Sequence, residues 1–167
     1  MAEFEGCPGS RMADFRGKDE GGGDAPAGKV ASQLRQWPIQ MHLISPMAPY
    51  YQGADVLLSA DCVAYAFGGF HPEFLSAKGG STSGGKGKAI GIACPKLDEG
   101  QDVYVEKIKS WIEDAKINTL TVLIMQVPCC MGLLQLAKQA AESAKRKVPI
   151  KYIVVGVQGE ILKEEWV

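Results

Sequence analysis

Apolar runs alternate with amphipathic segments along most of this chain. Four runs have the length and the near-continuous apolar character of strands that are buried on both faces: residues 54–62, 88–95, 119–128 and 150–159. Two segments between them repeat apolar residues at helical spacing, and these are residues 102–115 and 131–147. The alternation predicts parallel βαβ units, so we expect an α/β fold, a Rossmann-like three-layer domain with a mostly parallel sheet.

Two further segments complete the predicted domain. The run "PIQMHLI", residues 38–44, is the candidate for a first strand. Residues 63–75 predict a short helix that is broken at Gly68 and Gly69.

Composition divides the chain into three parts. We expect an N-terminal segment at 1–15 that contains Cys7, a flexible tether at 16–35, and an α/β metal-binding domain at 36–167. The domain contains a Gly/Ser-rich insertion at 76–88. This insertion nearly matches the sequence of a phosphate loop, but Gly87 stands where Ser or Thr should bind magnesium. A phosphate loop also follows a strand and opens a helix, whereas this segment follows a predicted helix and enters a predicted strand. We therefore do not expect nucleotide binding there.

Charge and hydropathy exclude several classes of partner. The chain has 18 Lys and Arg against 19 Asp and Glu, so no overall field attracts nucleic acid or an anionic membrane. No apolar run approaches the roughly 20 residues of a membrane-spanning helix, and the start of the chain lacks the features of a signal peptide. These features predict a soluble cytoplasmic protein that binds neither nucleic acid nor membrane.

Cysteines follow three of the predicted strands. Cys62, Cys94 and the pair Cys129–Cys130 each stand at a strand end, and the fifth cysteine is Cys7. A single cysteine in such a place is most often a small apolar filler. Parallel strands, however, have their carboxyl ends at one edge, where open α/β sheets bind ligands. If the strands are neighbours, the four thiols form a shared metal or redox site, with Cys7 as an additional or substitute ligand.

The chemistry of such a site stays open at this point. Thiolates bind both zinc and iron–sulfur clusters, and the absence of the CxxC pairs common in zinc sites favours a cluster. Cys129 and Cys130 can reach one centre only if the backbone turns there, as Pro128 and Gly132 would allow; a vicinal disulfide is the alternative.

Charged and histidine residues near these positions are weaker candidates. His71 could bind the centre or donate a hydrogen bond to it, and Asp61 and Lys96 could tune its field. His42, inside the expected first strand, is more typical of a structural residue.

Four blocks of this sequence resemble a known family. The blocks are "LRQWPIQMHLISPMAPYYQGADVLLSADCVAYAFGGFHPEFL", "ACPKLDEG", "INTLTVLIMQVPCCMGLLQLAKQA" and "VPIKYIVVGVQGEI". They are similar, in order, to the C-terminal domain of ferredoxin-type 4Fe-4S proteins of anaerobic bacteria and archaea. The similarity covers nearly the whole chain from Gly6 onward. In that family the domain follows a dicluster ferredoxin module whose cysteine runs are absent here, so we expect a shortened or stand-alone member.

The resemblance implies an iron–sulfur redox protein with a 4Fe-4S or larger cluster. The cysteines of the family motifs fall on all five positions here: Cys7, Cys62, Cys94, Cys129 and Cys130. The function we expect is electron transport or cluster-based small-molecule redox chemistry. A redox partner protein or a ferredoxin module would then be the partner, and a second copy of the chain is a further candidate.

Two alternative functions belong to other classes of protein. The thiols could hold zinc in a non-redox binding module, or Cys129 and Cys130 could serve a thiol–disulfide redox protein. No catalytic residue is identified, since the sequence contains no nucleophile motif.

Overall fold

A five-stranded sheet forms the centre of the protein. The computed structural model describes residues 8–16, 28–77 and 88–167, so Cys7, much of the expected tether and most of the Gly/Ser insertion lie outside the described residues. The strand order is β4-β3-β5-β6-β7. The strands are β3 (Asp55–Ala60), β4 (Ala89–Ala93), β5 (Thr119–Met125), β6 (Ile150–Val155) and β7 (Ile161–Trp166). The first four run parallel and β7 is antiparallel to β6, which confirms the predicted mostly parallel α/β sheet.

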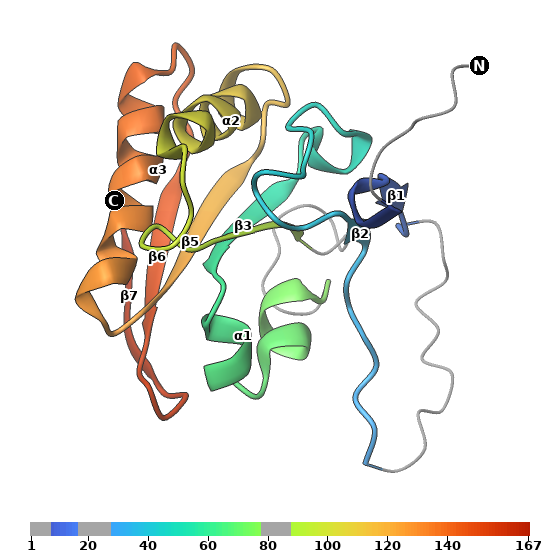
Figure 1. The fold of residues 1–167 in the computed structure, drawn as a ribbon, viewed down its shortest axis with the longest axis vertical. Helices are drawn as coiled ribbons and strands as arrows, with labels where there is room; N and C mark the ends of the chain where they lie inside the picture. Colours follow the sequence, from blue (N-terminus) through green and yellow to red (C-terminus); the bar gives the residue numbers. More distant parts are fainter. Residues whose placement is uncertain (1–7, 17–27, 78–87) are drawn as a thin grey trace.

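Helices cover both faces of this sheet. The chain steps from β3 to β4 in one direction and from β4 to β5 and β6 in the other. Right-handed crossovers therefore place α1 (Val63–Ala66) on one face and both α2 (Gln101–Glu113) and α3 (Met131–Ser143) on the opposite face. Figure 1 shows α2 and α3 side by side, with α1 apart from them. Among the described residues, no helix is long and apolar enough to cross a membrane.

The expected broken helix is present as two short pieces. After α1 the chain passes Gly68 and Gly69 and forms a π-helical turn, η3 (His71–Leu75). The rings of Phe67 and Phe74 contact each other at a tilt, with centroids 5.0 Å apart, and this contact packs the second piece against the first.

The buried face of α2 follows from its sequence period. Tyr104, Ile108, Trp111 and Ile112 recur at helical spacing and are all fully buried. Trp111 lies so close to β4 that a Cβ atom on Gly91 would meet its ring at 2.8 Å. Gly91 is therefore required for close packing between this helix and the sheet.

The expected first strand at 38–44 is wrong. This segment makes a single parallel bridge, Gln40 to Ile92, and then turns, with the Ile44 N–H bonded to the Gln40 carbonyl at 3.1 Å. Lys107 holds the turn by donating from Nζ to the carbonyl oxygens of Met41, His42 and Ile44. The segment covers the outer edge of β4 without extending the sheet.

The side chain of Gln36 replaces part of that missing strand. Its amide accepts a hydrogen bond from the Ile90 N–H at 2.8 Å and donates to the Ile90 carbonyl at 2.9 Å. It also donates to the Tyr51 hydroxyl, and Gln36 is almost completely buried. These bonds satisfy backbone groups of β4 that a neighbouring strand would otherwise pair.

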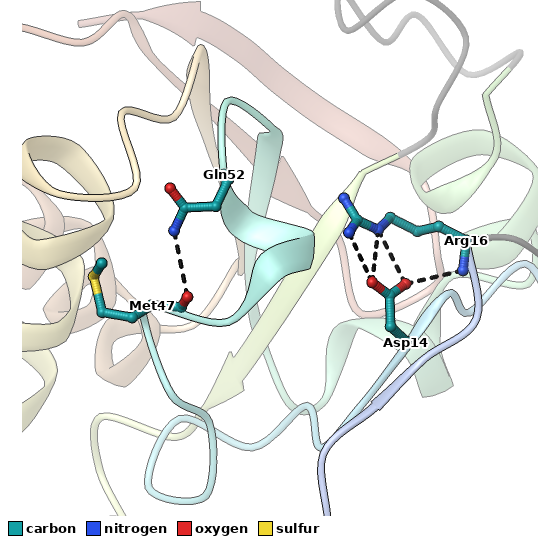
Figure 2. A network of polar contacts seen from close by, with 4 residues as sticks. All are labelled: Asp14, Arg16, Met47 and Gln52. Atoms are coloured by element: carbon teal, nitrogen blue, oxygen red, sulfur yellow. Dashed lines mark hydrogen bonds and ion pairs between the residues drawn. The ribbon is translucent and has the colours of Figure 1, made fainter.

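A small second sheet connects the N-terminal segment to this edge. β1 (Ala13–Asp14) pairs antiparallel with β2 (Gln36–Trp37), so the chain on either side of the expected tether lies together. Arg16 forms an ion pair with Asp14, with Nη2 and Oδ2 2.7 Å apart (Figure 2). Both side chains are about one-third exposed, so the pair adds at most about 1 kcal/mol to stability.

Replacing Gln36 tests how much this edge depends on it. Gln36→Leu leaves the Ile90 N–H buried without its partner, and we expect a loss of about 2–3 kcal/mol in the free energy of unfolding. Chemical denaturation of the two proteins measures the difference. Gln52→Leu is the matched control, because the Gln52 amide makes one exposed 3.3 Å bond to the Met47 carbonyl (Figure 2). Equal losses in the two variants would contradict the edge role of Gln36.

Candidate functional site

Four cysteines follow three neighbouring strands at one edge of the sheet. Cys62 comes two residues after β3, Cys94 directly follows β4, and Cys129 and Cys130 lie in the 3-10 turn η4 (Pro128–Cys130) that follows β5. β4, β3 and β5 are adjacent and parallel, so their carboxyl ends meet at the same edge. The structure therefore brings all four sequence-predicted positions in its described part to one side of the domain.

This edge contains the topological switch point of the sheet. The chain leaves β3 toward β4 and leaves β5 toward β6, in opposite directions. Connections that diverge in this way open a crevice beyond the carboxyl ends of the two strands, and open α/β proteins bind their ligands there. Cys62 follows one of these strands, and Cys129 and Cys130 follow the other.

The four thiols differ in their access to solvent. Cys62 and Cys129 are exposed, Cys94 is half-buried and Cys130 is buried, and all four are free cysteines. The site therefore has an open outer side and an inner side that packs on the protein. A bound group would be partly shielded from water and still within reach of another molecule.

The backbone turns at the adjacent pair, as the sequence suggested. Pro128 occupies the first position of η4, and the Cys130 N–H donates to the Val127 carbonyl at 3.1 Å. Helix α3 begins at the next residue, Met131. Because Cys129 and Cys130 lie in a helical turn, their side chains do not point to opposite faces as they would in a strand.

The pKa values of the thiols show that these cysteines influence one another. A hydrogen bond with Asp61 raises the pKa of Cys62, and burial, the Asp61 charge and the nearby Cys94 and Cys129 thiols raise it further. Burial is the main cause that raises the pKa of Cys130, with contributions from Cys129 and Cys62. The thiolates would repel one another, which favours the protonated forms when nothing positive lies between them.

The loop after β4 holds Cys94 in a defined position. The Leu97 N–H points at the Cys94 sulfur, with 3.4 Å between nitrogen and Sγ. The Cys94 N–H in turn donates to the carboxylate of Asp98 at 2.9 Å. The Tyr104 hydroxyl donates to the same carboxylate oxygen, and so does the Gln40 amide at 3.3 Å. Asp98 thereby joins the cysteine loop to α2 and to the segment that covers β4.

Asp98 is the site residue that the sequence did not reveal. It stands four residues after Cys94 in "CPKLD", where an acid looks like an ordinary loop charge. The signal that could have found it is local, because the Asp98 N–H also bonds the Cys94 carbonyl at 2.9 Å and closes a turn. Asp and Asn commonly cap turns of this kind.

The other sequence candidates occupy less central places. His71 Nδ1 accepts a hydrogen bond from the Gln33 N–H at 3.0 Å, and His42 Nε2 donates to the Glu99 carbonyl at 2.7 Å. Both rings therefore join distant segments of backbone. Lys96 is exposed on the Cys94 loop. Asp61 is the one of these four whose side chain contacts a candidate thiol, that of Cys62.

Across residues 8–16, 28–77 and 88–167, no three His, Cys, Asp or Glu side chains lie close enough together to hold one metal ion. The four cysteines thus share an edge without forming a compact single-ion site. Cys7 lies outside the described residues.

The fold is that of an open α/β protein, with four cysteines at the carboxyl edge of three adjacent parallel strands. Residues 48–167 match the family described as Rossmann-like domain, and this match spans more than half of the chain. The chain therefore belongs to the Rossmann-like domain family.

A relative matches most of the chain. An uncharacterized protein of Archaeoglobus fulgidus is 28% identical over 131 residues, which is 77% of this chain and 83% of that protein. No solved structure gives a significant match.

Removing the charge next to Cys62 tests the electrostatics of the site. The raised pKa of Cys62 leaves less thiolate at a given pH than an ordinary cysteine has, so we expect iodoacetamide to alkylate Cys62 more slowly than an ordinary exposed cysteine in metal-free protein. Asp61→Asn removes the main cause, and we expect the pH profile of Cys62 alkylation to move to lower pH. Peptide mass spectrometry measures it.

Asp102→Asn, an exposed acid in the first turn of α2, is the control for a general change of charge. A Cys62 profile that does not move in Asp61→Asn, or that moves equally in both variants, would show that Asp61 does not set this pKa.

Proposed function

We propose that the protein binds an iron–sulfur cluster through the cysteines at this sheet edge and serves electron transfer or cluster-based small-molecule redox chemistry. The observation that carries the proposal is the convergence of Cys62, Cys94, Cys129 and Cys130 from three adjacent parallel strands. Four thiols along the carboxyl edge of an open α/β sheet form a soft donor set, and three of them follow the two strands of the switch point, where such folds bind ligands.

A cluster can bind thiols that lie too far apart to share a single ion. Zinc needs four donors at about 2 Å from one point, and the described residues offer no such group. In a cluster each thiolate binds a different iron, so the sulfur atoms stand farther apart.

The electrostatics of the edge also suit a cationic centre. The Asp61 hydrogen bond is the main cause that raises the pKa of Cys62, and burial is the main cause for Cys130; the neighbouring thiols raise both pKa values further. Iron placed between these sulfurs would neutralise the repulsion and favour the thiolate forms, since ligation and deprotonation are coupled. Without such a centre, the same clustering only makes the thiols less reactive.

The Cys94 loop offers the sulfur contact typical of such centres. The Leu97 N–H lies 3.4 Å from Cys94 Sγ, and hydrogen bonds of this kind raise the reduction potential of a cluster. Asp98 keeps the loop in place through its bond from the Cys94 N–H. The chain thus supplies thiolates, an amide donor and partial burial, while the cluster itself would supply one-electron chemistry.

The family resemblance supports the same conclusion from the sequence. The motifs of the ferredoxin-type 4Fe-4S proteins place cysteines at the four edge positions and at Cys7. Cys7 is therefore the candidate for a fifth or replacement ligand. The exposure of Cys62 and Cys129 would let a redox partner protein or ferredoxin module approach the cluster.

A thiol–disulfide activity is the second candidate. Cys129 and Cys130 are hydrogen-bonded neighbours, one exposed and one buried, which is an arrangement for an attacking and a resolving thiol. The raised pKa of Cys130 opposes this use, because thiol–disulfide exchange requires a thiolate.

Anaerobic purification with iron and sulfide analysis tests the proposal. We expect a brown protein with visible charge-transfer absorption and about four irons and four sulfides per chain, as a cubane cluster requires. A colourless protein that carries zinc would establish the binding-module alternative. A metal-free protein whose Cys129 and Cys130 form a reversible disulfide would establish the thiol–disulfide alternative. Either result would refute the iron–sulfur function.

Single Cys→Ser variants identify the ligands. We expect Cys62→Ser and Cys94→Ser to lose most of the iron and the visible absorption, because each removes the thiolate that follows one strand. Cys7→Ser decides whether a fifth cysteine takes part. Ala64→Ser, at an exposed position on α1, is the control that adds a hydroxyl nearby without removing a thiol. Full cluster content in both Cys62→Ser and Cys94→Ser would refute this site.

A further inference from the structure

Strand β7 leaves one edge of the sheet open. It pairs with β6 on one side, and on its other side no described strand pairs with it (Figure 1). All six of its residues are exposed. Trp166 is 59% exposed, Leu162 46% and Ile161 43%. Exposed apolar residues on an open edge strand are a common site of strand pairing between chains.

The backbone of β7 presents alternate residues to that open side. The Val167 N–H donates to the Ile150 carbonyl at 2.8 Å, and Lys151 stands opposite Trp166. In an antiparallel ladder this pattern makes Lys151–Trp166 a non-hydrogen-bonded pair. The N–H and C=O groups of Trp166 and Glu164 therefore point away from β6, toward whatever lies beyond the edge.

The sequence of the strand is complementary to itself. Residues 161–167 read "ILKEEWV", with apolar residues at both ends and charges in the middle. If two copies run antiparallel with Glu164 at the centre, Lys163 of one faces Glu165 of the other, and Leu162 faces Trp166. Lys163 and Glu165 also form an ion pair within each chain, with Nζ and Oε2 2.6 Å apart, so the four charges of the two copies would lie together with alternating sign. Opposite charges and apolar pairs directly across a ladder both stabilise it.

The like charges at the centre of that register are already compensated. Lys151 of β6 forms an ion pair with Glu164, so each copy brings a neutralised carboxylate to the two-fold axis. The register shift between Val154 and Val155 leaves Leu162 as the extra residue of a bulge. The regular part of β7 is thus Lys163–Trp166, which contains the central residue and both charges of the proposed pairing.

We propose that two copies of this chain associate through β7, antiparallel and centred on Glu164, to form one continuous sheet of ten strands, five from each copy. The interface is isologous, as in most soluble homodimers. A register centred on Glu165 would instead place Lys163 opposite Val167 and Glu164 opposite Trp166, so it would lose the pairing of opposite charges across the ladder. The association does not depend on the cysteine site, because β6 separates β7 from the nearest cysteine-bearing strand.

Charge exchange on β7 tests both the association and its register. Light scattering during gel filtration under reducing conditions should give a dimer for the wild-type chain. Lys163→Glu places two glutamates opposite each other across the interface, and Glu165→Lys places two lysines there. Each variant alone should raise the dissociation constant at least about tenfold, because like charges that face each other across an interface cost more than 1.4 kcal/mol.

The mixture of the two variants gives the sharper result. A Lys163→Glu chain and a Glu165→Lys chain complement each other, so mixing them should restore the dimer, and the double variant should dimerise with itself. Lys147→Glu makes the same charge change at an exposed position outside β7 and should leave the dimer intact. Circular dichroism verifies that each variant is folded.

Three outcomes would overturn the proposal. A wild-type chain that stays monomeric at high concentration would exclude the dimer. Single variants that dimerise as well as the wild type would place the interface elsewhere. Two folded monomeric variants that fail to combine on mixing would exclude this register.

Discussion

The parallel pairing of β3 with β4 on one side and with β5 on the other is the constraint on which the candidate site depends. Register places Ala60 beside Ala93 and Ser59 beside Leu123, so the three strands reach the carboxyl edge at similar heights. The cysteines that follow them are separated by roughly 30 residues in sequence and meet only because these ladders align. A shift in this pairing would separate the cysteine-bearing loops while leaving each of them locally intact.

The two outer edges of the sheet differ in how far other parts of the chain cover their backbone groups. At β4, a buried glutamine amide and a single bridge at Gln40 replace a sixth strand, and Lys107 fixes the turn beyond it. At β7, the edge is open and carries exposed apolar and charged residues. Neither edge is extended by a further parallel strand, because a parallel neighbour would require another crossover helix. The closed edge also positions Gln40, whose side chain bonds Asp98 behind the cysteine loop.

Much of the fold was predictable from hydrophobic pattern, because the four parallel strands are near-continuous apolar runs and α2 and α3 have clear helical periods. The segment at 38–44 was wrongly predicted as a strand for a physical reason. It is apolar because it packs against the sheet edge, not because it joins a ladder. β7 gave no strand signal, since "ILKEEW" lacks an alternation of apolar and polar residues. The second helix was expected to reach residue 147 but ends at Ser143, where Ala144 becomes extended.

The site was predictable only in part. Strand ends could be located from the sequence, whereas the order β4-β3-β5, which makes Cys62, Cys94 and Cys129 neighbours, arises from a crossover that passes over β3. Asp98 acts through a turn and three hydrogen bonds, none of which has a distinct sequence pattern. The nature of the bound group depends on distances between sulfur atoms, which no spacing along the chain determines.

A crystal structure of anaerobically purified protein, with diffraction data collected on both sides of the iron absorption edge, would locate a bound iron–sulfur cluster. We expect strong anomalous density beyond the carboxyl ends of β4, β3 and β5, bonded to the sulfurs of Cys62 and Cys94 and to at least one of Cys129 and Cys130. Iron bound elsewhere, or anomalous density at this edge that appears only above the zinc edge, would contradict it.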